Sequence, residues 1–219
     1  MACSAPVAGR RSTSSRLRSV TVSACRFPSI RVRLHSRPRQ SPTRLYTIEP
    51  GPLARYTGSM RDLIQSFKYR DRHEGLPMFG RWLVRAGADI LTDAELIVPV
   101  PLYPSRLWTR RFNQSALLSQ RVSRLTGIPA DCFVLQRVRR TASQVGLSPQ
   151  QRQRNVAGAF KVNPKRMPRV SERRIVVVDD VITTGATAEA CARVLKRAGA
   201  ARVDILALAR AVEPTAWVL

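Results

Sequence analysis

Hydrophobic residues recur at the spacing of one helix face in four stretches after residue 55. The first runs from Met60 to Phe67 and the second from Phe79 to Leu91. The third covers residues 113–127 and the fourth residues 187–200, and each of these two ends near a glycine. This periodicity predicts four amphipathic helices, with Gly127 and Gly199 marking where the last two end.

Short apolar runs alternate with these helices. They cover residues 96–102, 132–138, 175–180 and 202–210. Runs without polar alternation are typical of strands buried on both faces, and strands that alternate with helices form parallel sheets. We therefore expect an α/β fold with a mainly parallel central sheet and helices on both faces. The polar segment 139–155 predicts a mobile loop with a short helical end.

The first 48 residues differ in character from the rest. They contain ten arginines and neither Asp nor Glu, and their apolar residues follow no helix or strand period. Such a segment buries too little apolar surface to offset its conformational entropy. We expect a basic, disordered arm over 1–48 and a folded domain over 49–219. Four interpretations of the arm stay open: a transit peptide, a polyanion-binding tail, a solvated leader without a role, or a shifted reading frame.

Positive charge dominates both parts of the chain. The net charge is +24, of which the arm carries +10 and residues 49–219 carry +14. This balance predicts affinity for polyanions such as nucleic acid. No run approaches the roughly 18 apolar residues of a transmembrane helix, so we expect no membrane span. The cysteines form no C-x-x-C pair, which favours a reducing, cytoplasmic compartment and argues against zinc and disulfides; they are Cys3, Cys25, Cys132 and Cys191.

The apolar run from Ile175 leads directly into two carboxylates and a small loop. Asp179 and Asp180 end the strand, and the loop to the next helix holds Thr183, Thr184, Gly185, Ala186 and Thr187. Glycine permits close approach of the backbone, hydroxyls add donors, and a helix N-terminus attracts anions, so the loop predicts a phosphate site. The carboxylates would repel phosphate but accept hydrogen bonds from ribose hydroxyls. The stretch therefore fits a sugar phosphate, with Mg²⁺ held nearby.

The alternative interpretation of this stretch is a tight turn with threonine caps and two solvated acids. We favour the ligand site because strand, acids, loop and helix agree with one another. Neither G-x-x-x-x-G-K-[ST] nor G-x-G-x-x-G occurs in the chain, so neither a P-loop ATPase nor a dinucleotide-binding fold is indicated.

The string VVVDDVITTGAT (176–187) is similar to the phosphoribosyl pyrophosphate (PRPP) motif of type I phosphoribosyltransferases. The wider chain resembles the ComF family of competence-associated proteins over about residues 53–211. Segments 56–74, 98–119 and 140–160 and the PRPP motif occur in the order that the family shows. The resemblance implies a type I phosphoribosyltransferase fold, in which 139–155 is a mobile hood loop over PRPP.

Two departures from the family pattern stand out. The family usually has Arg-Gly-Phe-Asn-Gln where this chain has Arg110 followed by Arg111-Phe112-Asn113-Gln114. Members typically begin with a cysteine-rich zinc ribbon, whereas residues 1–48 hold only Cys3 and Cys25. We therefore favour a shifted frame or wrong start for the arm, and we expect no zinc.

The resemblance also implies roles for individual residues. Asp179 and Asp180 would accept hydrogen bonds from the ribose 2′ and 3′ hydroxyls, and both are candidate Mg²⁺ ligands. Residues 183–187 would bind the 5-phosphate. Arg106, Arg110 and Arg111 are candidates for binding pyrophosphate, with a solvated basic loop as the alternative. Lys68, Arg110 and Arg111 are the candidates for a direct part in catalysis; Gln144, Arg152 and Asn155 match hood positions without an assigned role.

Two functions from different classes follow. The first is a phosphoribosyltransferase that binds PRPP with Mg²⁺ and transfers the phosphoribosyl group to an unidentified nitrogenous acceptor, releasing pyrophosphate. The second is a non-catalytic protein of DNA uptake that binds PRPP or single-stranded DNA and acts with competence proteins. Trp108 lies among the loop arginines, where it either packs or stacks on a base. A homodimer is an open alternative to a monomer.

Overall fold

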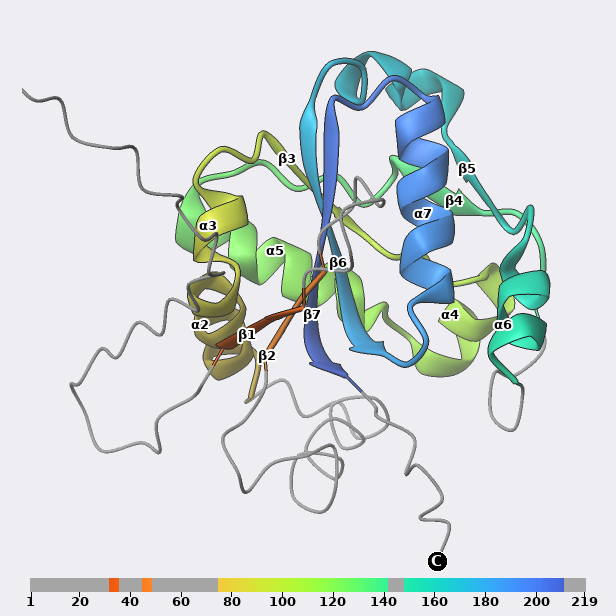
Figure 1. Cartoon of the computed structure of the whole chain (residues 1–219). Helices are drawn as coiled ribbons and strands as arrows, with labels where there is room; N and C mark the ends of the chain where they lie inside the picture. The colour runs from red at the N-terminus through yellow and green to blue at the C-terminus, as the bar shows by residue number, and fades with distance from the viewer. Residues whose placement is uncertain (1–31, 36–44, 49–74, 142–147, 211–219) are drawn as a thin grey trace, which may run out of the picture.

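The computed structural model describes residues 32–35, 45–48, 75–141 and 148–210 (Figure 1). The helix predicted over 60–67, and with it Lys68, lies outside these residues. The same holds for Gln144 and the centre of the predicted hood loop.

A five-stranded sheet forms the centre of the fold, in the order β1-β2-β7-β6-β3 (Figure 1). β2, β7, β6 and β3 run parallel, and β1 pairs antiparallel with β2 at one edge. The bounds are β1 (Val32–His35), β2 (Leu45–Ile48), β3 (Leu96–Pro99), β6 (Arg174–Ile182) and β7 (Arg202–Arg210). The predicted α/β architecture with a mainly parallel sheet is confirmed.

Helices cover both faces of this sheet. Helix α7 (Ala186–Arg197) lies on one face, and α2 (Leu76–Ala86), α3 (Ala88–Leu91) and α5 (Gln114–Thr126) lie on the other (Figure 1). Side chains alternate along β6 to match: Ile175 and Val177 join the core beneath α7, while Val176 and Val178 pack with the helices opposite. A strand buried on both sides needs an uninterrupted apolar run, which is the pattern that the sequence shows.

A small antiparallel hairpin packs beside α7. It consists of β4 (Leu135–Arg137) and β5 (Phe160–Val162), and β5 contacts α7. Along the chain, α6 (Pro149–Val156) connects the two strands. A capping box between Ser148 and Gln151 closes the first turn of this helix. The 3₁₀ helix η2 (Pro164–Arg169) then leads back towards β6. β4 is shorter than the strand predicted over 132–138, and α6 is the helical end predicted for 139–155.

Two expectations for the chain are corrected. The arm over 1–48 was expected to lack regular structure, and this is wrong at β1 and β2. Both strands take their hydrogen bonds from the strand beside them, β1 from β2 and β2 from β7 through Leu45–Thr47 against Ile205–Ala207, so they need little local sequence signal. The segment that carries Arg106, Arg110 and Arg111 was expected to form a loop but contains helix α4 (Pro104–Arg110), which begins with a proline in its first turn.

Three further observations concern an ion pair, two cysteines and the lengths of the helices. Arg202, at the start of β7, bonds the buried carboxylate of Asp204 through Nε at 2.8 Å and also pairs with Asp93. Cys191, on the buried face of α7, is buried as predicted, whereas Cys132 is only half-buried. Within the described ranges, no helix has the length and apolar character needed to cross a membrane.

Candidate functional site

The carboxylate of Asp179 lies near the C-terminal end of β6 and is only 8% exposed. Its Oδ1 accepts a hydrogen bond from the backbone N–H of Asp180 at 2.9 Å and another from the hydroxyl of Ser115 at 3.1 Å. Asp180 is half-buried, and its Oδ1 accepts from the N–H of Val181 at 2.7 Å. Adjacent strand residues point to opposite sides, so the two acids occupy different environments.

The loop after β6 ends at Gly185, which adopts the left-handed conformation with φ 84°. This conformation suits glycine because a Cβ would be strained there, and it turns the chain into the first turn of α7. Gly185 has no side chain with which to cap the helix. The hydroxyl of Thr184 accepts a hydrogen bond from the N–H of Ala186 at 3.5 Å. The start of α7 therefore presents backbone donors and the positive end of its dipole towards the loop.

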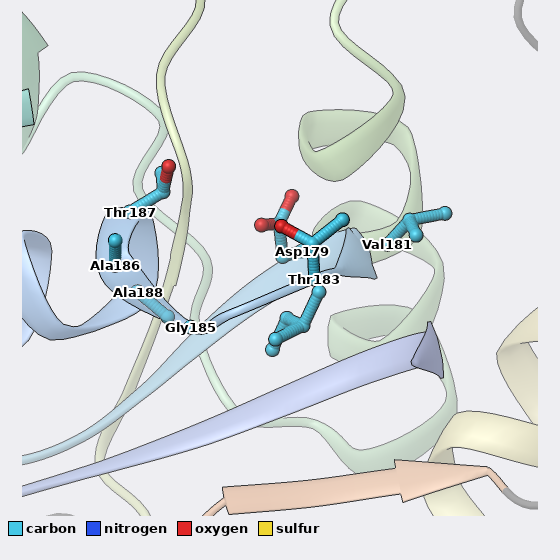
Figure 2. Close-up of a pocket in the computed structure, with 8 residues that line it drawn as sticks. Asp179, Val181, Thr183, Gly185, Ala186, Thr187 and Ala188 are labelled. Carbon is cyan, nitrogen blue, oxygen red and sulfur yellow. The ribbon is translucent and has the colours of Figure 1, made fainter. Parts of the chain in front are cut away.

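A small pocket that is open to solvent lies between the end of β6 and the start of α7. Figure 2 shows the oxygens of Asp179, Thr183 and Thr187 on the same side of the loop around Gly185. The residues that line the pocket are Asp179, Val181, Ile182, Thr183, Gly185, Ala186, Thr187 and Ala188. The structure thus brings five of the seven predicted ribose and phosphate residues together, and Asp180 and Thr184 lie outside the lining.

The predicted pyrophosphate residues lie on or directly after α4. Arg106 and Arg110 are half-buried and Arg111 is exposed. Asn113 caps the following helix α5 by accepting from the N–H of Ser115 at 3.1 Å. Because Ser115 also bonds Asp179, the segment that carries the arginines ends beside the carboxylate.

Arg137 is a site residue that the sequence interpretation missed. It ends β4, its guanidinium lies 5.3 Å from the ring centroid of Phe160, and it donates to the hydroxyl of Thr141. Burial lowers the pKa of Arg137, the positive charge of Arg106 lowers it further, and the carboxylate of Asp179 opposes both. Arg137 therefore experiences the charge of Arg106, on α4, and that of Asp179, in the pocket. The signal in the sequence was an arginine within the mostly apolar strand predicted over 132–138.

Two of the three hood candidates, Arg152 and Asn155, lie on α6. Arg152 is 6% exposed, which is unusual for an arginine, and Asn155 is half-buried. The backbone oxygens of Asn155 and Ala157 accept hydrogen bonds from Arg139 at 2.8 and 2.7 Å. Arg139 therefore joins the end of α6 to the residues that follow β4.

Arg111 stands in the left-handed region with φ 62°, at the C-terminal end of α4. Replacing Arg111 with glycine should stabilise the fold by about 0.5–1 kcal/mol, because glycine carries no Cβ to strain in this conformation. The same change should weaken binding of inorganic pyrophosphate if the guanidinium contacts it. Urea unfolding would measure the first effect and titration the second.

Glu172, with φ 58°, provides a matched control for this experiment. Glu172→Gly should stabilise by a similar amount without any change in pyrophosphate binding. An Arg111→Gly variant that is less stable than the native chain would contradict the strain argument.

Comparisons with known proteins agree with this geometry. A family model described as "Phosphoribosyl transferase domain" matches residues 114–216. Competence protein F of Haemophilus influenzae is 37% identical over 166 residues, covering 73% of this chain and 71% of that protein. DNA utilization protein YhgH of Escherichia coli is 39% identical over 163 residues, covering 72% of this chain and 70% of that protein.

Among solved structures, the glutamine phosphoribosylpyrophosphate amidotransferase of B. subtilis is 22% identical, with a TM-score of 0.44. The match covers 65% of this chain and 30% of the amidotransferase. The family model covers the end of β6, the loop and the start of α7 that build the pocket, and each of the two curated relatives covers more than two thirds of the chain. The chain therefore belongs to the competence protein F (ComF) family and contains a phosphoribosyl transferase domain with the type I fold.

Proposed function

We propose that this protein is a phosphoribosyltransferase that binds PRPP with Mg²⁺ and transfers the phosphoribosyl group to a nitrogenous acceptor. One observation carries the proposal. A buried carboxylate, Asp179, and a glycine-opened helix N-terminus, at Gly185, line the same pocket.

These two groups suit opposite ends of a sugar phosphate. The N-terminus of α7, with Thr183 and Thr187, offers donors to the 5-phosphate. Asp179 offers acceptors, which ribose hydroxyls satisfy and a phosphate would not. Asp180, the next residue of β6, lies outside the pocket lining. A ligand with both a diol and a phosphate satisfies both ends.

The pyrophosphate of PRPP would lie towards α4. Arg106 comes from that helix, and Arg137 lies within its electrostatic reach. Two like charges held near each other repel, and a polyanion between them removes the repulsion. Arginine forks also match phosphate oxygens in pairs.

The donor set fits Mg²⁺ that arrives with the substrate. In the described ranges, no group of three or more His, Cys, Asp or Glu side chains could hold a metal ion. Mg²⁺ commonly binds one or two carboxylates together with substrate phosphates and water. Asp179 and Asp180 would supply the carboxylates, and the metal would neutralise charge on the pyrophosphate as it leaves.

The reaction would displace pyrophosphate from the anomeric carbon by attack of a nitrogen on the acceptor. The bond from the anomeric carbon to the pyrophosphate oxygen breaks, and a bond from that carbon to nitrogen forms. The chain's own residues bind and orient the two substrates, and none needs to act as a nucleophile. A closing hood would keep water away from the electron-poor carbon.

Calorimetric titration of the full chain with PRPP, with and without Mg²⁺, tests the binding step. We expect binding that requires Mg²⁺, followed by pyrophosphate release when candidate bases or amines are added. A folded protein that does not bind PRPP under either condition would contradict the proposal. Binding without release for any acceptor would favour a PRPP-binding protein without turnover.

A second candidate, single-stranded nucleic-acid binding, is favoured by the surface of α4. Trp108 is 86% exposed on this helix, which also carries Arg106 and Arg110. Exposed aromatic rings beside arginines stack on bases and bind phosphates. The names of the two curated relatives refer to competence and DNA utilization. Salt-dependent binding of a labelled oligonucleotide that Trp108→Ala weakens would support this candidate.

A further inference from the structure

The first turn of α5 contacts the deepest carboxylate of the pocket. The hydroxyl of Ser115 donates to Oδ1 of Asp179 at 3.1 Å, across 64 residues of sequence. Ser115 is 5% exposed and Asp179 is 8% exposed, so the bond lies away from water. A hydrogen bond to a charged group in such surroundings is stronger than one at the surface.

The same turn is fixed to the end of β3. Asn113 donates through Nδ2 to the carbonyl of Val100 at 3.0 Å and accepts from the N–H of Ser115 at 3.1 Å. The N–H of Val100 donates to the carbonyl of Val178, the residue before Asp179, at 2.9 Å. This ring of hydrogen bonds joins β3, the start of α5 and the end of β6.

Both hydrogen bonds described for the Asp179 carboxylate converge on one oxygen. Oδ1 accepts from Ser115 and, at 2.9 Å, from the backbone N–H of Asp180. Two donors on one oxygen fix the rotation of the carboxylate about its Cβ–Cγ bond. The N-terminus of α5, which carries Ser115, also places the positive end of a helix dipole beside the negative charge.

We propose that Ser115 is a positioning residue: its hydroxyl holds Asp179 in the orientation that accepts hydrogen bonds from the ribose diol. This inference rests on the proposed function. It also links the two halves of the site, because Ser115 follows directly after the segment that carries Arg106, Arg110 and Arg111.

Ser119 separates this role from simple packing. It lies one turn further along α5, is fully buried, and its hydroxyl has no hydrogen-bond partner among the described residues. Ser119→Ala therefore removes a buried hydroxyl from the same helix without touching Asp179. Any effect that Ser115→Ala has beyond this control belongs to the contact with the carboxylate.

The test titrates five full-length proteins with PRPP in the presence of Mg²⁺ and, separately, with inorganic pyrophosphate in its absence. They are the native chain, Ser115→Ala, Ser119→Ala, and Asp179→Asn with and without Ser115→Ala. We expect Ser115→Ala to weaken PRPP binding roughly tenfold, which is the effect of one charge-assisted hydrogen bond. Pyrophosphate has no diol, so its affinity should stay unchanged, and Ser119→Ala should match the native chain for both ligands. In the Asp179→Asn background, Ser115→Ala should cause no further loss.

Equal PRPP affinities for Ser115→Ala and Ser119→Ala would overturn the inference, as would equal losses for PRPP and pyrophosphate in Ser115→Ala. In both of these outcomes the native chain still binds PRPP, so only the inference about Ser115 fails. If the native chain binds no PRPP, it is the proposed function that fails, and the inference that rests on it fails as well. Thermal unfolding of each variant monitors the fold. Should Ser115→Ala not fold, Ser115→Cys keeps the volume and a weak donor, and an intermediate loss of PRPP affinity is then expected.

Discussion

Replacing Asp179 and Asp180 together with asparagine should weaken PRPP binding at least about a hundredfold while leaving the protein folded. Each change converts an ionised acceptor into a neutral amide, and hydrogen bonds to charged groups contribute about 1.5–3 kcal/mol each. Asparagine keeps the size of the side chain and an oxygen for the bonds from Ser115 and from the backbone of Val181. Calorimetry measures the affinity, and circular dichroism monitors the fold.

The single variants separate the two acids. Asp179 lines the pocket and Asp180 does not, so Asp179→Asn should cause the larger loss. Asp89, an exposed carboxylate on α3, provides the control, and Asp89→Asn should bind PRPP as the native chain does. Native affinity in the double variant would remove the ribose-binding role from both residues.

Replacing Arg202 with methionine should destabilise the fold by about 2–4 kcal/mol. The guanidinium pairs with Asp204, whose side chain is 2% exposed, and losing the partner of a buried carboxylate is costly. We expect this loss of stability to be smaller than for a fully buried pair, because the Arg202 side chain is 26% exposed. Methionine retains most of the apolar stem, so the loss reports on charge. Urea unfolding at neutral pH measures it.

Arg173 is the matched control for Arg202. It pairs with Glu95 at the surface, with its side chain 52% exposed, so Arg173→Met should cost less than about 1 kcal/mol. Adding Asp204→Asn to Arg202→Met should restore part of the lost stability, because the buried charge is then gone. Equal losses for the two arginine variants would contradict the argument from burial.

The pH dependence of the Arg202 variant gives a second check. The hydrogen bond from Arg202 holds the pKa of Asp93 below its usual range. A lowered folded-state pKa gives stability that is present above the pKa of the unfolded chain and is lost as pH falls through the folded value. The native chain should therefore lose more stability than Arg202→Met on acidification below about pH 4.

The sequence allowed the strand, the loop and the helix of the pocket to be predicted because each has a strong local signal. The apolar run of β6 indicates burial on both faces, and Gly185 before an amphipathic stretch indicates a loop that opens a helix. Local signals of this kind depend on neighbours along the chain. They are sufficient for the element and for the chemistry that it carries.

The remaining features depend on residues far apart in the sequence. Ser115 became a candidate only through its bond to Asp179, and Arg137 only through the charges of Arg106 and Asp179 that act on it. No periodicity marks either residue. Helix α4 had one local signal, Pro104 in its first turn. None of its residues is buried, so its sequence shows no apolar face. The roles of Lys68 and Gln144 stay predictions.

The parallel pairing of β2 with β7 sets a limit on how this domain can be shortened. Leu45–Thr47 pair with Ile205–Ala207, so a chain beginning at residue 49 would leave that side of β7 without this neighbour. Its N–H and C=O groups would then form an open edge beside fully buried apolar side chains, which is a template for pairing with a second molecule. A truncated protein of this kind should aggregate, and loss of ligand binding in it would report on solubility and not on the pocket.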